Sequence, residues 1–186
     1  FNGRDLSGWQ GEKQFWSVED GELVGRGRNL NRCGFLIADP RYENFILRSS
    51  FKLVEGNSGL QFRSLEQPDD PDRPLRGYHA DIAPPDAWGS LYDYGGTRGV
   101  LSKDLPPEQS QRLVVGHGWN DMTVQAAGPR ITVWVNGVAT ARFMETDPNQ
   151  PRHGVIGFQL HRGEQPTEVR LRDIRIRKLT PEDLEP

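Results

Sequence analysis

The chain has 186 residues, 34% of them hydrophobic, which is enough for one well-buried core and favours a single domain. Its 23 basic and 26 acidic side chains give a formal charge of -3, so electrostatics give no reason to expect nucleic acid or an anionic membrane as a partner. No apolar run approaches the roughly 20 residues of a membrane-spanning helix, and the single Cys33 excludes a disulfide framework. We predict one β-sandwich domain at residues 1–180 and an acidic tail at residues 181–186.

The first predicted element is a hairpin near the start of the chain. Apolar stretches at residues 15–18 and 23–24 flank Asp20 and Gly21, and an Asp-Gly pair between apolar stretches signals a tight turn. Residues 35–37 then form a short strand with a buried character. A longer strand follows and leads into the stretch that carries the main polar motif.

This motif, from Gly56 to Arg63, combines a turn with a strand that has two unlike faces. Leu60 and Phe62 point to one side, because successive strand side chains alternate. Gly59, Gln61 and Arg63 point to the other side. The first face suits a core, and the second suits the floor of a polar groove.

The same alternation recurs in two later segments. His79 and Asp81 share the polar side of residues 78–82, and Gln159 and His161 share that of residues 156–161. If the three strands belong to one sheet, their polar sides form one surface. The side chains expected to line this pocket are Gln61, Arg63, His79, Asp81, Gln159 and His161.

Two long irregular segments lie between the strands. Residues 64–77 contain three prolines and three aspartates, and residues 83–111 contain Trp88, Tyr92 and Tyr94 among prolines and glycines. Long irregular connections inside a compact domain are often lids or binding loops. We therefore expect residues 83–111 to pack over the polar pocket.

The last third of the chain completes an all-β pattern. Asn136-Gly137 gives the strongest hairpin signal, since both residues tolerate positive φ. Between Leu171 and Ile174 the apolar spacing breaks, which predicts a β-bulge. No helical period extends over 10 residues, so the sequence predicts a two-sheet sandwich.

A series of motifs resembles the 3-keto-disaccharide hydrolase family, in order along nearly the whole chain. These motifs are residues 1–9, 18–21, 56–63, 77–78, 118–120, 131–137 and 157–161. The resemblance implies a concanavalin A-like lectin/glucanase jelly roll with a sugar site on its concave face. It also implies action on glycosides oxidised to a ketone at C3, and a periplasmic or extracellular location, since many members are exported from bacterial cells.

One motif departs from the family pattern. Relatives usually carry Tyr-Glu-x-Gln where this chain has Tyr78-His79-Ala80-Asp81. An acidic position has become His79, and an amide has become Asp81. The family's roles for its Glu are therefore not carried onto His79.

The implied chemistry needs a base, an acid and an electrophilic group. A 3-keto group acidifies the C2 proton, so a base can remove it while the C1 substituent leaves, and water then adds to the enone. His161 is the first candidate base, because imidazole titrates near pH 6.5. His79 and Asp81 fit a functional role about as well as ordinary surface polarity. The functional role is either a base with its orienting carboxylate or two ligands of a divalent metal ion.

Other side chains are candidates for substrate binding. Arg63 suits a keto oxygen or a hydroxyl through its fork of donors, or it pairs with Asp81 as a structural group. Asn57, Gln61 and Gln159 offer the donors and acceptors that sugar hydroxyls require. The aromatic candidates are Tyr78, Trp88 and Tyr92, whereas the tryptophans expected in the core are Trp9, Trp16 and Trp134.

The sequence leaves three functions open: a 3-keto-glycoside-cleaving enzyme, a conventional two-carboxylate glycoside hydrolase, and a non-catalytic carbohydrate-binding module. In all three the expected partner is a small carbohydrate, with no nucleic acid and no membrane. A divalent metal ion stays open as a cofactor.

Overall fold

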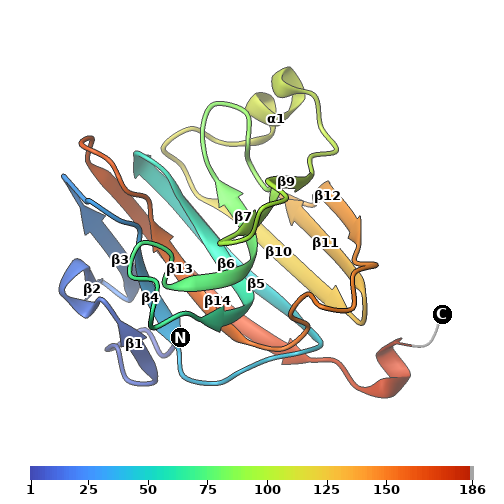
Figure 1. The fold of residues 1–186 in the computed structure, drawn as a ribbon. Coiled ribbons are helices and arrows are strands. Elements are labelled where there is room, and N and C mark those ends of the chain that lie inside the picture. Colours follow the sequence, from blue (N-terminus) through green and yellow to red (C-terminus); the bar gives the residue numbers. More distant parts are fainter. Residues whose placement is uncertain (185–186) are drawn as a thin grey trace.

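The computed structural model describes residues 1–184 and shows two antiparallel seven-stranded sheets stacked face to face (Figure 1). Sheet A has the spatial order β1 (Trp9–Gly11), β4 (Gly34–Ala38), β13 (Val155–Leu160), β6 (Ser58–Glu66), β7 (Leu75–Ile82), β8 (Leu91–Tyr94) and β9 (Val100–Ser102). Sheet B has the order β12 (Val138–Met144), β11 (Arg130–Val135), β10 (Asn120–Ala127), β5 (Phe45–Glu55), β14 (Thr167–Lys178), β3 (Glu22–Gly27) and β2 (Trp16–Glu19).

The remaining regular elements are short. They are the helix α1 (Pro107–Leu113) and the 3-10 turns η1 (Lys13–Phe15) and η2 (Pro181–Leu184). None of the helices within residues 1–184 is long and apolar enough to cross a membrane. The predicted jelly-roll sandwich is confirmed, and the end of the predicted acidic tail, residues 185–186, lies outside the described residues.

The core lies between the two sheets and follows from the period of two. Along β5, every second residue from Phe45 to Leu53 is buried, and Leu60 and Phe62 of β6 meet this face from the other sheet. Burying each such side chain contributes about 1.5–3 kcal/mol. Outside this core, Phe35, Ile37, Leu75 and Val155 of sheet A form a second, smaller apolar cluster with Cys33.

Both predicted tight turns are confirmed. Asp20 and Gly21 have φ of 50° and 81°, and Asn136 and Gly137 have φ of 48° and 80°. Positive φ at both central residues defines the turn whose twist matches that of a two-stranded ribbon. These turns fix the registers of β2 with β3 and of β11 with β12.

Register shifts interrupt several of the ladders, and two of these β-bulges bear on the predictions. The predicted one in β14 is confirmed: the register with β5 shifts between Arg172 and Arg175, and Asp173 has a φ of 53°. A second bulge, in β6, shifts the register with β7 between Phe62 and Leu65, and Arg63 has a φ of 47°. This second bulge changes the side to which Arg63 points.

Residues 83–111 do not form an irregular lid, and that part of the expectation was wrong, although the ring of Tyr94 does lie over His79 on the polar face. The segment contributes β8 and β9, which extend sheet A beyond β7, and the start of α1. The connection that lies over the outer side of sheet A is instead the loop between β6 and β7 (Figure 1). Arg32 Nη1 fixes this loop near β4 by donating to the carbonyl of Pro71 at 3.0 Å.

Candidate functional site

The outer side of sheet A is concave. The rings of Phe35 on β4 and Tyr94 on β8 have centroids 5.4 Å apart, although four strand spacings separate these strands. In a flat sheet that separation is about 19 Å. The two rings meet because the sheet curves toward them, and together they roof the middle of the concave face.

Beneath these two rings, strand β6 carries a glycine, Gly59. A Cβ at Gly59 would lie 2.1 Å from His79 Nε2, so the imidazole occupies the space over this residue. The ring of His79 also lies 5.8 Å from that of Tyr94. Beneath the roof, Gln61, His79 and Gln159 are at most 2% exposed.

A continuous polar chain, here called the Asp81 chain, runs through this buried region to its edge. Gln61 Oε1 lies 2.8 Å from His79 Nδ1, and His79 Nε2 lies 3.4 Å from Asp81 Oδ1. Ser90 donates its hydroxyl to Asp81 Oδ2 at 2.6 Å. The Asp81 side chain is 20% exposed, so the chain begins under the roof and ends at solvent.

Two polar atoms on this face have no hydrogen-bond partner within residues 1–184. They are Gln61 Nε2, a donor on β6, and Asn57 Oδ1, an acceptor in the residue just before β6. Buried polar atoms are nearly always hydrogen-bonded, so unpaired ones call for an explanation. Both atoms are buried, whereas the Asn57 residue as a whole is partly exposed, so it lies at the edge of the covered region.

His161 lies on the same face, just after the end of β13. Its side chain is exposed, its ring Nδ1 lies 2.6 Å from the carbonyl of Arg162, and its backbone N–H donates to Asn57. Gly59 pairs with both Asp81 and Gln159, which places His161 about 12 Å from Asp81 between Cα atoms. The two side chains therefore flank an open area.

Arg63 does not belong to this surface, and the expectation that it lines the pocket was wrong. Because of the bulge in β6, its guanidinium turns to the carbonyls of Glu43 and Gly128 and to Asn44 Oδ1, at 2.7 to 3.1 Å. Burial lowers the pKa of Arg63 to about 10, so it keeps its charge at neutral pH. It closes the opposite end of the sandwich, roughly 20 Å along β6 from His161.

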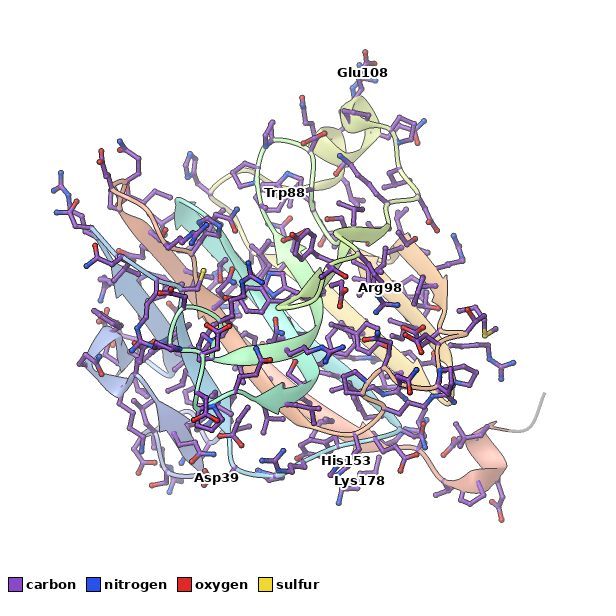
Figure 2. All side chains as sticks on the ribbon, in the orientation of Figure 1. Asp39, Trp88, Arg98, Glu108, His153 and Lys178 are labelled. Carbon is purple, nitrogen blue, oxygen red and sulfur yellow. The ribbon has the colours of Figure 1, made fainter. Side chains whose placement is uncertain are left out.

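Two aromatic candidates also lie elsewhere. Tyr78 is 1% exposed on the core side of β7 and donates its hydroxyl to Glu145. Trp88 stacks on Phe51 of the core with centroids 6.2 Å apart. Figure 2 places Trp88 and Glu108 toward one end of the molecule and Asp39, His153 and Lys178 toward the other.

Tyr92 is the aromatic candidate that the concave face does present. It pairs with His79 across β7 and β8 and is 39% exposed. Val100 of β9 pairs with Tyr92 and is 57% exposed, so the two form an apolar edge beside the polar groups. No sequence pattern marks Val100, because its position beside Tyr92 depends on the pairing of β9 with β8.

No group of three or more metal-ligating side chains exists within residues 1–184. His79 and Asp81 supply two donors, and Gln61 and Ser90 occupy their remaining contacts. The described residues do not fit a divalent metal site, so no chemical step is derived through a metal.

Comparison with solved structures shows the same fold. Two putative glycosyl hydrolases from Parabacteroides distasonis ATCC 8503 are 21% and 22% identical to this chain, with TM-scores of 0.69 and 0.68. The first aligns with 97% of this chain over 92% of its own length, and the second with 95% of this chain over 96% of its own length. The carbohydrate-binding module CBM66 from Bacillus subtilis is 14% identical with a TM-score of 0.68, over 91% of this chain and 94% of its own.

A search of curated proteins finds no match. The family model described as the 3-keto-alpha-glucoside-1,2-lyase-like domain matches residues 1–177. It therefore covers every strand of both sheets except the last residue of β14. This chain has a jelly-roll fold with a polar concave face. It belongs to the 3-keto-alpha-glucoside-1,2-lyase-like family.

Proposed function

We propose that this protein cleaves 3-keto-glycosides by removal of the C2 proton, loss of the C1 substituent and addition of water. The observation that supports the proposal is the Asp81 chain, which joins a buried imidazole to a carboxylate at the open part of the concave face. Clefts that hold such linked titratable groups are the usual places for proton transfer.

In the proposed reaction the Asp81 carboxylate takes the C2 proton, which the neighbouring ketone acidifies. The electron pair left at C2 forms the enone as the bond from C1 to the aglycone oxygen breaks. His161, across the open area, donates a proton to that oxygen. Water then adds at C1 and C2 regains a proton, so the products are the free 3-keto sugar and the free aglycone.

His79 acts behind Asp81 in this scheme. Its Nε2 lies 3.4 Å from Asp81 Oδ1, so the ring packs beside the carboxylate, and Gln61 Oε1 lies 2.8 Å from the opposite ring nitrogen. Tyr92 offers its exposed ring to the sugar, since aromatic faces give large contact area with few rotatable bonds. Asn57 remains the proposed partner of a sugar hydroxyl, whereas Gln159, like Gln61, is buried under the roof.

The geometry disfavours a conventional glycosidase. Such enzymes flank the bond with two carboxylates about 5–9.5 Å apart. Besides Asp81, the strands of sheet A carry two carboxylates. Asp93 of β8 is buried and paired with Arg98, and Glu66 of β6 is paired with Arg41 and lies six residues further along the ladder, roughly 20 Å away. No second carboxylate on these strands is close enough to act with Asp81.

The experiment compares a 3-keto-glucoside with its parent glucoside, in ordinary and in deuterated water. We expect aglycone release from the keto form alone, with deuterium at C2 of the product, because that proton is lost and then replaced from solvent. Equal cleavage of the parent glucoside, or a product without deuterium at C2, would reject the proposal.

A non-catalytic carbohydrate-binding module is the second candidate. The roof of Phe35 and Tyr94 favours it, because it hides Gln61, His79 and Gln159 from a substrate. The similarity in fold to CBM66 also agrees with it. Binding of the 3-keto-glucoside without turnover would select this function.

A further inference from the structure

The outer side of sheet B carries a row of four aligned residues that the concave face does not involve. Arg175 of β14 pairs with Arg48 of β5, Arg48 with Thr123 of β10, and Thr123 with Trp134 of β11. Their strand neighbours Leu47, Val124 and Val133 are buried, so this row, here called the Arg48 row, faces outward. It spans three strand spacings, about 14 Å.

The two arginines of the row are a like-charge pair placed directly opposite each other, which destabilises a sheet. Arg48 has no ion pair within residues 1–184. Arg175 reaches Asp173 at 3.8 Å, with its side chain 82% exposed. Elsewhere on the same side, Arg170 contacts Glu168 at 2.8 Å and Glu22 at 3.1 Å, so sheet B does pair its arginines where the fold requires it.

The row borders a hollow of about 460 Å³ on the outer side of sheet B. One wall is the turn at Gly137, and the other is the bulge at Asp173. The floor is polar: Ser50 donates its hydroxyl to Asp121 at 2.6 Å, and Thr123 lies beside them. The hollow thus combines cations with hydroxyl and carboxylate acceptors.

Trp134 ends the row as a half-buried aromatic residue. The expectation that it belongs to the core was wrong, because the period of two along β11 turns Ile131, Val133 and Val135 inward and Trp134 outward. An indole on an outer sheet surface, next to polar side chains, offers an apolar face to a sugar ring.

From this arrangement we infer a second saccharide-binding surface, specific for a saccharide that carries a carboxylate or sulfate group. Arg48 and Arg175 bind the anionic group, for which the guanidinium fork is suited. Thr123, Ser50 and Asp121 bind hydroxyls in the hollow, and Trp134 contacts a ring at the end of the row. The surface lies on the sheet opposite Asp81, so a saccharide bound there leaves the concave face free.

The test measures the binding of three probes: a galacturonic acid trisaccharide, a sulfated galactose trisaccharide and neutral maltotriose. We expect one of the anionic probes to bind, more weakly as salt is raised because the exposed charges are screened. Arg48→Gln with Arg175→Gln should weaken that binding by about tenfold or more. Trp134→Ala should weaken the binding of the trisaccharide and leave any binding of free sulfate unchanged.

The matched control removes the same charge from the same sheet. Arg142 and Arg177 are exposed and are paired with Asp104 and Asp183, so the double variant Arg142→Gln with Arg177→Gln should change binding by less than about twofold. Asp81→Asn should leave the binding intact, which separates this inference from the proposed function. Absence of binding by both anionic probes, equal binding of maltotriose, or an equal loss in the control pair would overturn it.

Discussion

Two buried polar clusters on adjacent strands of sheet A are built in opposite ways. The first, here called the Arg98 cluster, joins Arg98 to Asp93 at 3.1 Å and to Glu145 at 2.8 Å, and Tyr78 also donates to Glu145 at 2.7 Å. Both carboxylates are 3% exposed. The second is the Asp81 chain, which contains no guanidinium or ammonium group and ends at a partly exposed carboxylate.

The difference separates a structural cluster from a functional one. In the Arg98 cluster each buried charge faces an opposite charge, so its removal leaves uncompensated charge in the core. The Asp81 chain has an unpaired amide at Gln61 and a long contact of 3.4 Å, which is a poorer arrangement for stability. Polar groups held in such a way at a cleft are more useful for proton transfer than for folding.

The largest expected effect is on folding, from Arg98→Met. Asp93 and Glu145 would both lose their cation inside the core, so the free energy of unfolding should fall by about 3–5 kcal/mol. Urea denaturation measures it. The matched control is Arg142→Met, whose ion pair with Asp104 is on the surface and should cost less than about 1 kcal/mol. Equal losses in the two variants would remove the contrast between the clusters.

Asp81→Asn should act in the reverse manner, on turnover more than on folding. Release of aglycone from a 3-keto-glucoside should fall roughly 100-fold or more, the usual contribution of a positioned acid or base. His161→Ala should give a loss of similar size. Glu66→Gln removes a carboxylate from the far end of the same face and should leave turnover unchanged. A large loss of stability with Asp81→Asn would place Asp81 among the structural groups instead.

The sequence predicted the common face of Gln61, His79, Asp81 and Gln159 because strand alternation depends only on local residues. Arg63 does not follow this alternation, because a bulge with positive φ changes the side to which it points. Nothing in the sequence of β6 marks this bulge. The bulge at Asp173 was predictable, because there the apolar spacing itself breaks.

Features that depend on distant strands could not be derived from the sequence. The roof joins Phe35 to Tyr94 through the curvature of five strands, and the Arg98 cluster joins β8 to a residue just after β12. Trp88 lies in a segment whose composition is typical of a lid, but its side chain packs on Phe51 of the core. Composition identified the aromatic residues, and only the sheet order showed which of them faces the groove.

Gly59→Ala tests the packing of the Asp81 chain. The new Cβ would lie 2.1 Å from His79 Nε2 and 2.9 Å from the carbonyl of Ala80, so the imidazole must move away from Asp81. Overpacking of this kind should lower the free energy of unfolding by about 1–3 kcal/mol. The NMR signals of the His79 ring should also shift. Gly116→Ala, where a Cβ meets open space and φ is not positive, is the matched control for the effect of a Gly-to-Ala change without a clash. Unchanged His79 signals would show that the ring does not depend on Gly59.

The smallest expected effect is a dependence of stability on pH through Glu145. Burial opposes ionisation of this carboxyl, but the hydrogen bonds from Arg98 and Tyr78 outweigh it and lower the pKa of Glu145 below its usual value of 4.5. A carboxyl with a lowered pKa in the folded state stabilises the protein above its unfolded pKa and loses that contribution as pH falls through the folded value.

The difference in unfolding free energy between wild type and Glu145→Gln should therefore be constant from pH 7 to about 5 and shrink at lower pH. Urea denaturation across this range measures it, with Glu66→Gln as the surface reference. A difference that grows on acidification would mean that folding favours the protonated carboxyl, and Glu145 would then not be the charged partner of Arg98 on which the contrast with the Asp81 chain rests.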